Sequence, residues 1–424
     1  PSHGMICSQA ELGISDEHEG IWVLPAELTP GSPLVEALGL DDVILDVSVY
    51  ANRPDCMSVL GIAREVAALT DGRLRLPPVD YTELETPITE HTSVTVQDID
   101  LCPRYTAALL EGIVLGQSPL WMQLRLKGAG MRAINNVVDI TNYVMLETGQ
   151  PLHAFDFEQL AQGRLVVRTA SPGEQIETLD GSRRELTPEM LMICDARNPK
   201  CIAGVMGGLD SEVTAKTSTI LLETANFAPL NIRRTSRALG LSSESSARFE
   251  KGIAPGGTMF ASKRAIHLMQ KLAGARVYAG HIDVNSTSQE PTVIQLPLGE
   301  VERLLGVSIP EKTSREILER LEFAVQEVTP DLWRITVPAH RGDVKVAADL
   351  IEEIVRMWGL ENLPCTLPAD TSASGGQSRR LTVADQIRQI LVGAGLHEGL
   401  SYSFGRSDNN ARILRPSEPM IMVQ

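Results

Sequence analysis

The clearest pattern of apolar and polar positions lies between residues 131 and 156, MRAINNVVDITNYVMLETGQPLHAFD. From residue 137 to residue 146, the apolar side chains recur at the spacing of a helix that buries one face. A Gly-Gln-Pro sequence ends this helix, and residues 152–156 are expected to form a short strand or turn. The helix also carries Asn, Asp and Thr, which must be hydrogen-bonded if they are buried. The run is therefore either a polar helix end docked on a sheet or a pocket wall with His153 at its mouth.

The segment before this run reads as strand, turn and helix. Residues 43–49 (VILDVSV) have the composition of a strand, and residues 59–69 have the apolar spacing of a helix. Asp55, in the turn between them, is the expected N-cap of the helix. Residues 79–100 are acidic and rich in threonine, which is typical of a linker.

The segment after it is rich in predicted strands. Residues 165–170 form a strand, and Leu-Asp-Gly at 179–181 indicates a hairpin. The glycines of residues 202–208 permit close backbone approach, but no P-loop Lys-Ser/Thr follows them. Residues 220–223 are expected to be a strand that ends on the carboxylate of Glu223. The most basic short run of this region, IRRTSR, follows at residues 232–237.

A third unit is expected near residue 300. A short helical face over residues 301–305 ends at Gly306, and residues 313–316 (TSRE) read as a capping box that opens a second helix. A strand over residues 333–337 completes a pattern that resembles a helix-turn-helix module. Neither helix carries the cluster of Lys and Arg that groove reading needs, so a plain packing unit is the alternative.

The last part of the chain begins with a flexible linker at residues 366–378. An amphipathic helix is expected over residues 381–395, and SYSF at 401–404 is expected to be a strand. Because the chain opens at Pro1 and stops in a strand-like run, both ends are expected to be truncated.

Composition narrows the class of protein. At roughly 150 residues per domain, 424 residues correspond to about three domains. The formal net charge of −16 argues against broad non-specific nucleic-acid binding, although a local basic groove remains compatible with it. The six cysteines form no C-x-x-C pair, so neither a zinc site nor a disulfide framework is indicated. With no apolar run near the roughly 18 residues of a membrane span and no signal-peptide pattern, we expect a cytoplasmic protein.

One acidic cluster has the spacing of a cation site. Asp349, Glu352 and Glu353 share one helical face because positions i, i+3 and i+4 are neighbours. Asp343 can fold back from the preceding loop, and four carboxylates without His or Cys suit Mg²⁺. The alternative is an acidic first turn that complements the helix dipole.

Residues 134–156, together with NRPDCMSVLGIARE at 52–65, resemble the beta subunit of bacterial-type phenylalanyl-tRNA synthetases, and the resemblance runs over roughly residues 1–424. It implies an α+β multidomain chain with a central mixed α/β editing domain. Five parts are expected: the tail of a tRNA-binding OB-type domain (1–40), a strand–helix unit and linker (41–100), the editing domain (101–284), a small helix-turn-helix-like domain (291–365), and the start of a class II synthetase-like, catalytic-like domain (379–424).

The resemblance also implies an editing pocket. A hydrophobic site rejects an added hydroxyl poorly, so a second, hydrolytic site that binds the hydroxyl of tyrosine restores fidelity. The expected catalytic residues of the pocket are His153, Thr141 and Glu223, with Glu223 as the acceptor of that hydroxyl. The residues expected to bind the tRNA end or to shape the pocket are Arg132, Gly204, Gly207, Gly208 and Ser245. The acidic cluster becomes a Mg²⁺ site shared with an alpha subunit.

The implied activity is that of a ligase subunit. Two alpha and two beta chains would form a cytoplasmic tetramer, in which the alpha subunit uses ATP and Mg²⁺ to charge tRNA(Phe) with phenylalanine. This chain would hydrolyse mischarged Tyr-tRNA(Phe) and would contact neither membrane nor DNA. The rival interpretations are a freestanding aminoacyl-tRNA deacylase, disfavoured by residues 381–424, and a DNA-binding regulator using residues 301–337, disfavoured by the acidic charge.

Overall fold

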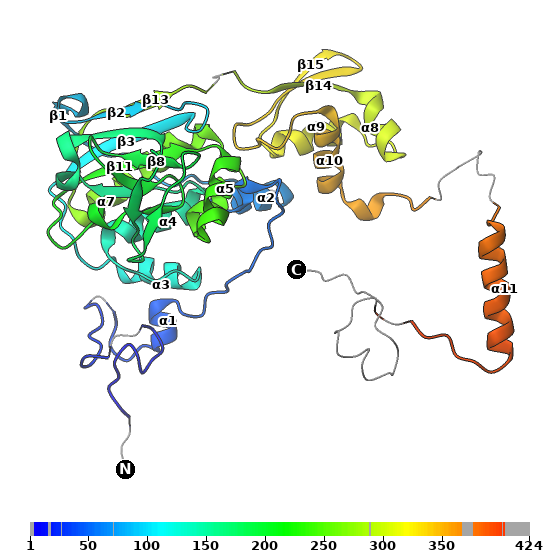
Figure 1. Cartoon of the computed structure of the whole chain (residues 1–424), viewed down its shortest axis with the longest axis horizontal. Coiled ribbons are helices and arrows are strands. Elements are labelled where there is room, and N and C mark those ends of the chain that lie inside the picture. Colours follow the sequence, from blue (N-terminus) through cyan, green and yellow to red (C-terminus); the bar gives the residue numbers. More distant parts are fainter. Residues whose placement is uncertain are drawn as a thin grey trace. The chain divides into compact units, whose positions relative to one another are not determined.

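The computed structural model of the chain describes residues 4–15, 18–26, 28–70, 72–287, 290–366, 376–400 and 402. The chain divides into two compact units, residues 1–364 and residues 365–424 (Figure 1). Helices and strands are mixed through the larger unit, which confirms the expected α+β, multidomain class. No helix among the described residues is long and apolar enough to cross a membrane.

The larger unit is built on a first sheet with the strand order β1-β12-β3-β11-β4, in which β13 also pairs with β3. Its strands are β1 (Glu83–Pro87), β3 (Arg104–Glu111), β4 (His153–Asp156), β11 (Thr219–Asn226), β12 (Arg276–Ala279) and β13 (Ile282–Asn285). The two longest strands, β3 and β11, pair antiparallel along all eight residues. Both are buried nearly throughout, because layers cover the two faces of the sheet.

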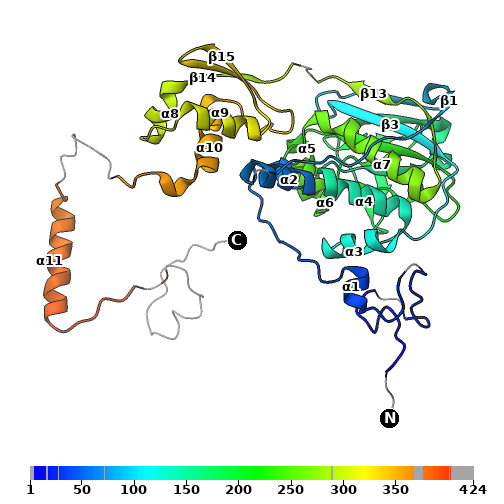
Figure 2. The ribbon, with the colours of Figure 1, turned by 180° about the vertical axis from the view of Figure 1, so that it is seen from behind.

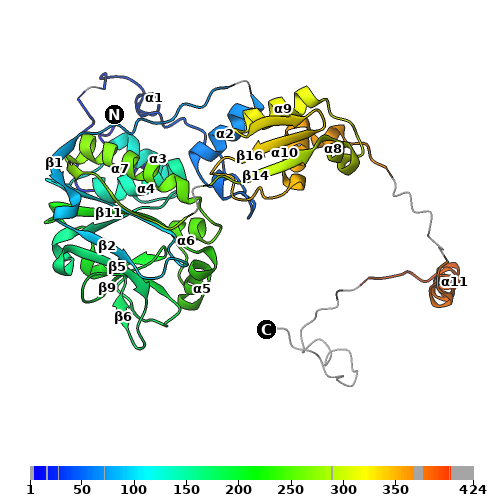
Figure 3. The same ribbon diagram turned by 90° about the horizontal axis from the view of Figure 1, so that it is seen from above.

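Helices cover one face of the first sheet, as Figure 3 shows from above. They are α3 (Leu120–Gly128), α4 (Asn136–Thr148) and α7 (Thr258–Ala273). Successive side chains of a strand point to opposite faces. Leu110, Ile220 and Leu222 therefore pack with these helices, whereas Leu109 and Leu221 face the other way.

Helix α4 is the helix expected from residues 137–146, and its buried polar groups have partners. Asn135 caps its start by accepting hydrogen bonds from two backbone N–H groups, and Gly149 ends it in the left-handed conformation. The Asn136 amide donates to the carbonyl of Val114 (2.9 Å), and Asp139 accepts the Ser118 hydroxyl (2.5 Å). These residues therefore dock a polar helix end on the sheet, which is the simpler of the two interpretations of this run.

A second sheet covers the opposite face and has the order β10-β9-β8-β5-β2 (Figures 1 and 3). Its strands are β2 (Ser93–Val96), β5 (Arg164–Thr169), β8 (Leu191–Cys194), β9 (Pro199–Ile202) and β10 (Met206–Gly207). One apolar cluster joins the two sheets, with Tyr105 and Phe155 from the first and Val167 and Ile193 from the second. The predicted hairpin exists as β6 (Gln175–Glu177) paired antiparallel with β7 (Arg183–Glu185).

Two helices close the end of the inter-sheet core, α5 (Pro229–Leu239) and α6 (Glu244–Phe249). The tight turn between β9 and β10 packs against them. Gly204 sits at this turn with φ +67°, and a Cβ atom there would come within 2.8 Å of Phe249 and 3.1 Å of Ile232. The turn therefore requires glycine both for its backbone conformation and for its packing.

Within the larger unit, residues 293–358 form the part that the sequence predicted as a third unit, and we keep that name for it. It contains a three-stranded sheet with the order β14-β16-β15 beside its helices (Figure 2). Its elements are β14 (Val293–Pro297), α8 (Leu298–Leu305), α9 (Glu311–Arg320), β15 (Ala324–Thr329), β16 (Leu332–Thr336) and α10 (Ala347–Trp358). Trp333 is buried at its centre. Helix α2 (Val59–Leu69) contributes Ala68 to the same core, so this N-terminal helix packs with the third unit. The smaller unit contains α11 (Arg379–Gly393), where the amphipathic helix was expected.

The structure contradicts several local expectations. Residues 43–49 pair with no strand and are mostly exposed, because an apolar run forms a strand only where a neighbour supplies hydrogen bonds. No strand is assigned in residues 4–15 and 18–26, and the only helix described before residue 41 is α1 (Leu34–Leu38). Ser58 rather than Asp55 caps α2, and α9 begins at Glu311 after Pro310, ahead of the expected capping box. Apart from Tyr402, the expected strand over 401–404 lies outside the described residues, as does 405–424 of the expected final domain.

We predict that Gly204→Ala lowers the free energy of unfolding by about 2–5 kcal/mol, because it adds left-handed strain to overpacking of the core. Gly173→Ala is the matched control, since Gly173 has φ +77° with nothing within 4 Å of its Cβ position. The control should lose only the strain, about 1–2 kcal/mol. Urea unfolding measures both variants, and equal losses would contradict the packing role of Gly204.

Candidate functional site

The expected pair Glu223 and His153 lies in the layer between the two sheets. In the antiparallel pairing of β11 with β4, these two residues stand directly opposite each other. Both side chains point toward the second sheet, because their neighbours Leu222 and Ala154 point toward the helices. Glu223 is not at a strand end as expected, since β11 continues to Asn226. The cross-strand register therefore brings together two groups that are 70 residues apart in the sequence.

Burial removes the charge from both groups. It raises the pKa of Glu223 to about 8, an effect that the nearby Tyr105 hydroxyl opposes. It lowers the pKa of His153 to about 4. At neutral pH Glu223 is thus mostly a carboxylic acid, and His153 is a neutral imidazole. Glu223, the expected acceptor of the tyrosine hydroxyl, is therefore uncharged.

Three polar atoms of this layer have no hydrogen-bond partner among the described residues. They are Glu223 Oε2, His153 Nε2 and Tyr105 Oη, and all three are inaccessible to solvent. The Tyr105 hydroxyl lies close enough to Glu223 to affect its pKa, but no hydrogen bond of normal geometry joins them. A buried polar group without a partner costs about 1–3 kcal/mol. Other buried groups of the described chain, such as the hydroxyls of Thr92 and Ser262, also lack partners. These three differ in that they lie together in one layer, where a ligand could supply the missing partners.

The glycine turn from β9 to β10 covers this pair. A Cβ atom at Gly207 would lie 2.7 Å from Cε1 of His153 and 3.1 Å from Leu179, at the tip of the β6–β7 hairpin. A Cβ atom at Gly208 would lie 2.6 Å from the carbonyl oxygen of Lys200. The glycines thus let backbone and hairpin close over the imidazole, and a ligand reaches it only if the turn or the hairpin tip moves.

The other expected pocket residues are not joined to this pair. The Thr141 hydroxyl donates to the carbonyl of Val138 (2.7 Å), and its helix α4 packs on the opposite face of the sheet. Arg132 is exposed between α3 and α4, and no hydrogen bond or ion pair joins it to another described residue. Ser245 is half-buried in α6, but the residue that ties α6 to the glycine turn is Ser243, which donates to the Val205 carbonyl (2.9 Å).

Tyr105 is the site residue that the sequence did not reveal. It lies on β3 opposite Ala225 and is fully buried. Its sequence signal is weak, because a tyrosine is common in an apolar strand. Only the register of β3 against β11 places its side chain on the same face as Glu223.

The four acidic residues expected to bind Mg²⁺ are not gathered around one point. Asp343 and Glu353 both bind the buried guanidinium of Arg341, at 2.7 Å each. Asp349 accepts the backbone N–H groups of Lys345 and Val346, and Glu352 is exposed. Because three of the carboxylates already hold partners, this arrangement does not fit a cation within the chain alone, and the shared metal site stays a prediction.

These acids belong instead to a chain of alternating charges, which we call the arginine–carboxylate network. Its members, in order of contact, are Asp55, Arg53, Glu65, Arg356, Glu353, Arg341 and Asp343. Glu65 of α2 accepts Arg356 of α10 at 2.6 Å, so the network ties the N-terminal helix to the third unit. Burial would raise the pKa of Glu353, but hydrogen bonds and charge from Arg341 and Arg356 lower it to about 2.

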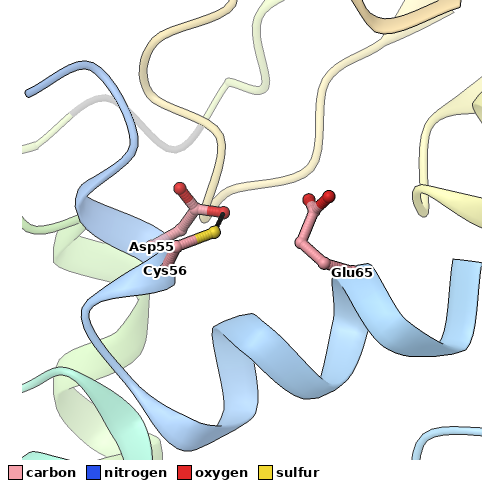
Figure 4. Close-up of side chains that lie close together, drawn as sticks. All are labelled: Asp55, Cys56 and Glu65. Carbon is pink, nitrogen blue, oxygen red and sulfur yellow. Dashed lines mark hydrogen bonds between the residues drawn. The ribbon is translucent and has the colours of Figure 1, made fainter. Parts of the chain in front are cut away.

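Asp55, Cys56 and Glu65 lie close enough to resemble a metal site, as Figure 4 shows. Arg53 already occupies the space between them. One Nη2 atom donates to Asp55 (2.7 Å), to Cys56 (3.2 Å) and to Glu65 (2.6 Å). Burial and the charge of Asp55 also raise the pKa of the Cys56 thiol to about 12 in the metal-free chain.

Three protein families match successive parts of the chain. The B3/4 domain matches residues 101–274. This range contains Glu223, His153 and Tyr105, which we call the inter-sheet site. The tRNA synthetase B5 domain matches residues 294–360, and the phenylalanyl tRNA synthetase beta chain CLM domain matches residues 363–423.

Whole-chain relatives carry one name, phenylalanine–tRNA ligase beta subunit. The chain is 47% identical over 409 residues to that of Moorella thermoacetica, covering 95% of this chain and 51% of the relative. It is 43% identical over 406 residues to that of Syntrophus aciditrophicus (95% and 50%) and 42% identical over 408 residues to that of Bacillus subtilis (95% and 51%). The chain therefore spans about half the length of these relatives. A crystallised N-terminal fragment of the Pyrococcus horikoshii phenylalanyl-tRNA synthetase beta subunit is 16% identical, with a TM-score of 0.38 over 73% of this chain and 85% of the fragment.

The raised pKa of Glu223 predicts a pH dependence of stability. The unfolded carboxyl ionises near pH 4.5, whereas the folded one keeps its proton to about pH 8. At this carboxyl the folded state binds more protons between these values, so its contribution to stability falls as the pH rises through this window. His153, whose pKa is lowered to about 4, contributes the opposite slope up to about pH 6.5, so the comparison with the variant isolates the effect of Glu223. Glu223→Gln should remove this fall and become more stable than wild type toward pH 8. Urea unfolding from pH 4.5 to 8.5 tests this, with the exposed Glu352→Gln as the control that should follow wild type. Parallel wild-type and Glu223→Gln profiles would show that Glu223 is not a buried neutral acid.

The arginine–carboxylate network predicts a stability effect that is independent of metal. Glu353→Ala leaves the buried Arg341 with one carboxylate fewer, which should cost about 3–5 kcal/mol. Glu352→Ala, one residue earlier and exposed, should change stability by less than about 0.5 kcal/mol. Thermal or urea unfolding is measured in EDTA and in excess Mg²⁺. A loss that appears only with Mg²⁺ would restore the metal site and contradict the network.

Proposed function

Because the chain belongs to the family of phenylalanine–tRNA ligase beta subunits, we propose that its central domain, residues 101–284, hydrolyses tyrosine wrongly attached to tRNA(Phe). The observation that carries this proposal is the pair of buried, unpartnered atoms on opposite strands, Glu223 Oε2 and His153 Nε2. They lie in the part of the chain that the B3/4 domain family matches.

Selectivity would come from the hydroxyl that distinguishes tyrosine from phenylalanine. A neutral carboxyl both donates and accepts a hydrogen bond, so Glu223 can pair with a phenol without a buried charge. Phenylalanine would leave the same carboxyl unpaired. That costs about 1–3 kcal/mol, or about 5- to 150-fold in preference at RT near 0.6 kcal/mol.

Hydrolysis would rely on positioning. The chain shows no Ser-His-Asp or Cys-His arrangement at the site, within the described residues. An aminoacyl ester is already reactive, so a water molecule held near the ester carbon suffices. The lowered pKa keeps the imidazole of His153 neutral at neutral pH, and in the tautomer with its proton on Nδ1 the free Nε2 can accept the proton of that water.

The remaining residues would serve the tRNA end. In this proposal Gly207 and Gly208 admit the terminal adenosine to the backbone, Arg132 meets the 3′ end and Ser245 limits the size of the pocket. Gly204 is packed against Phe249 and Ile232 and would serve only the turn itself. The expected place of Thr141 near the ester is not supported, because its helix α4 packs on the other face of the first sheet.

We further propose that the chain works in the cytoplasm in a tetramer of two alpha and two beta subunits. The alpha subunit would charge tRNA(Phe) with phenylalanine, using ATP and Mg²⁺. Co-purification with an alpha subunit distinguishes this assembly from a freestanding deacylase. A DNA-reading role for residues 301–337 is not favoured, because Arg303 and Arg315 there lie beside the carboxylates of Glu300 and Glu319.

Glu223→Ala should lose the preference for tyrosine while retaining some hydrolysis, and His153→Ala should slow hydrolysis of both substrates. The exposed Glu212→Ala is the control and should behave as wild type. The measurement is the rate of deacylation of Tyr-tRNA(Phe) and Phe-tRNA(Phe). If Glu223→Ala keeps the wild-type preference, Glu223 is not the partner of the hydroxyl. If the wild-type protein hydrolyses neither substrate, the editing function itself is wrong.

A further inference from the structure

Helix α5 presents a row of arginines that the proposed chemistry does not use. Ile232, Thr235 and Ser236 form its buried side. Arg233, Arg234 and Arg237 are all exposed. Positions three and four apart are neighbours on a helix, so Arg237 lies beside both of the others. We call these three residues the α5 arginine face.

The α5 arginine face is unpaired in a protein with an excess of acids. The sequence holds 54 Asp and Glu against 38 Lys and Arg. Buried and half-buried arginines elsewhere pair with carboxylates, as Arg264 does with Glu147 and Arg104 with Asp283. Other exposed arginines, such as Arg73 and Arg334, also have no ion pair among the described residues, but only α5 brings three of them onto one helical face. No ion pair or hydrogen bond from a side chain of the α5 arginine face is found among the described residues. Three like charges kept together without internal partners indicate an external anionic partner.

The α5 arginine face is held next to the turn that covers His153. Ile232 of α5 packs against Gly204 at the start of the turn. The C-terminal end of α5 is tied to the β6–β7 hairpin, because Arg184 donates to the Leu239 carbonyl (3.3 Å). The same hairpin donates the N–H of Leu179 to the carbonyl of Gly207 (3.1 Å). Helix α5, which carries the arginines, is therefore held against the turn and the hairpin that cover His153.

We propose that the α5 arginine face binds the phosphates of the RNA strand whose 3′ end enters the site. This inference rests on the proposed function. Guanidinium groups match phosphate oxygens in pairs, and phosphate contacts position a nucleic acid without reading its sequence. None of the residues on the exposed side of α5 is aromatic, so base stacking is not the mode of contact. A basic face on an acidic body also limits RNA binding to one orientation.

The test compares wild type with the triple variant Arg233→Gln, Arg234→Gln, Arg237→Gln in the full chain. Its charge-matched control changes three exposed arginines elsewhere, Arg73→Gln, Arg75→Gln and Arg334→Gln. Binding of deacylated tRNA(Phe) is measured between 50 and 300 mM salt, at about tenfold steps of protein concentration. For the triple variant we expect Kd to rise at least about tenfold and the slope of log K against log salt to fall by about 2–3, which is close to one for each phosphate contact. The control variant should keep the wild-type slope.

A second substrate separates this inference from the proposed function. The tyrosyl ester of adenosine carries no phosphate, so its hydrolysis reports the inter-sheet site alone. The triple variant should hydrolyse this ester at the wild-type rate, while its KM for Tyr-tRNA(Phe) rises and kcat is unchanged. If the triple variant keeps the wild-type affinity for tRNA(Phe) and the wild-type salt slope, the α5 arginine face does not bind RNA phosphates, and the editing proposal is unaffected. Wild-type failure on both substrates, with the salt slope still reduced in the triple variant, would overturn the editing proposal and leave RNA binding standing.

Discussion

The antiparallel pairing of β3 with β11 determines which side chain of the central domain faces which layer. Eight consecutive residues of each strand are in register, from Thr219 opposite Glu111 to Asn226 opposite Arg104. A slip of one residue would turn every side chain of a strand to the other face. Glu223 would then point into the helical layer, and Leu222 would take its place between the sheets. The strand register therefore decides which side chains lie in the inter-sheet site.

Burial explains how a carboxyl can lie in that layer. Its ionised form would need partners that the apolar surroundings do not offer, so the carboxyl keeps its proton and costs less than a buried charge. The fold still carries the cost of three unpartnered polar atoms, which the long, buried strands and the two apolar clusters on their faces offset. The arginine–carboxylate network shows the opposite solution, since the buried Glu353 remains charged beside the guanidinium groups of Arg341 and Arg356.

The sequence correctly predicted elements that depend on interactions between residues close together in the chain. Helix α4, the β6–β7 hairpin and α11 lie within a few residues of their expected positions, because apolar spacing, caps and turn residues act over short distances. The failures concern partners far apart in the chain. Residues 43–49 lack a neighbouring strand, and the role of Tyr105 depends on strand register. For the acidic face of α10, spacing alone could not reveal its partners Arg341 and Arg356, or Glu65 beyond them, and a metal site shared with an alpha subunit stays a prediction.

The contact between Glu65 and Arg356 spans 291 positions of the chain. At about 5–20 residues per second, a ribosome adds the second residue about 15–60 s after the first. Glu65 of α2 must remain without Arg356 during that time and can pair only with the nearby Arg53. Residues 101–284 are made before Arg356 and can fold as a unit. The network consequently joins the N-terminal helix to the third unit late in synthesis, after the inter-sheet site has had time to form.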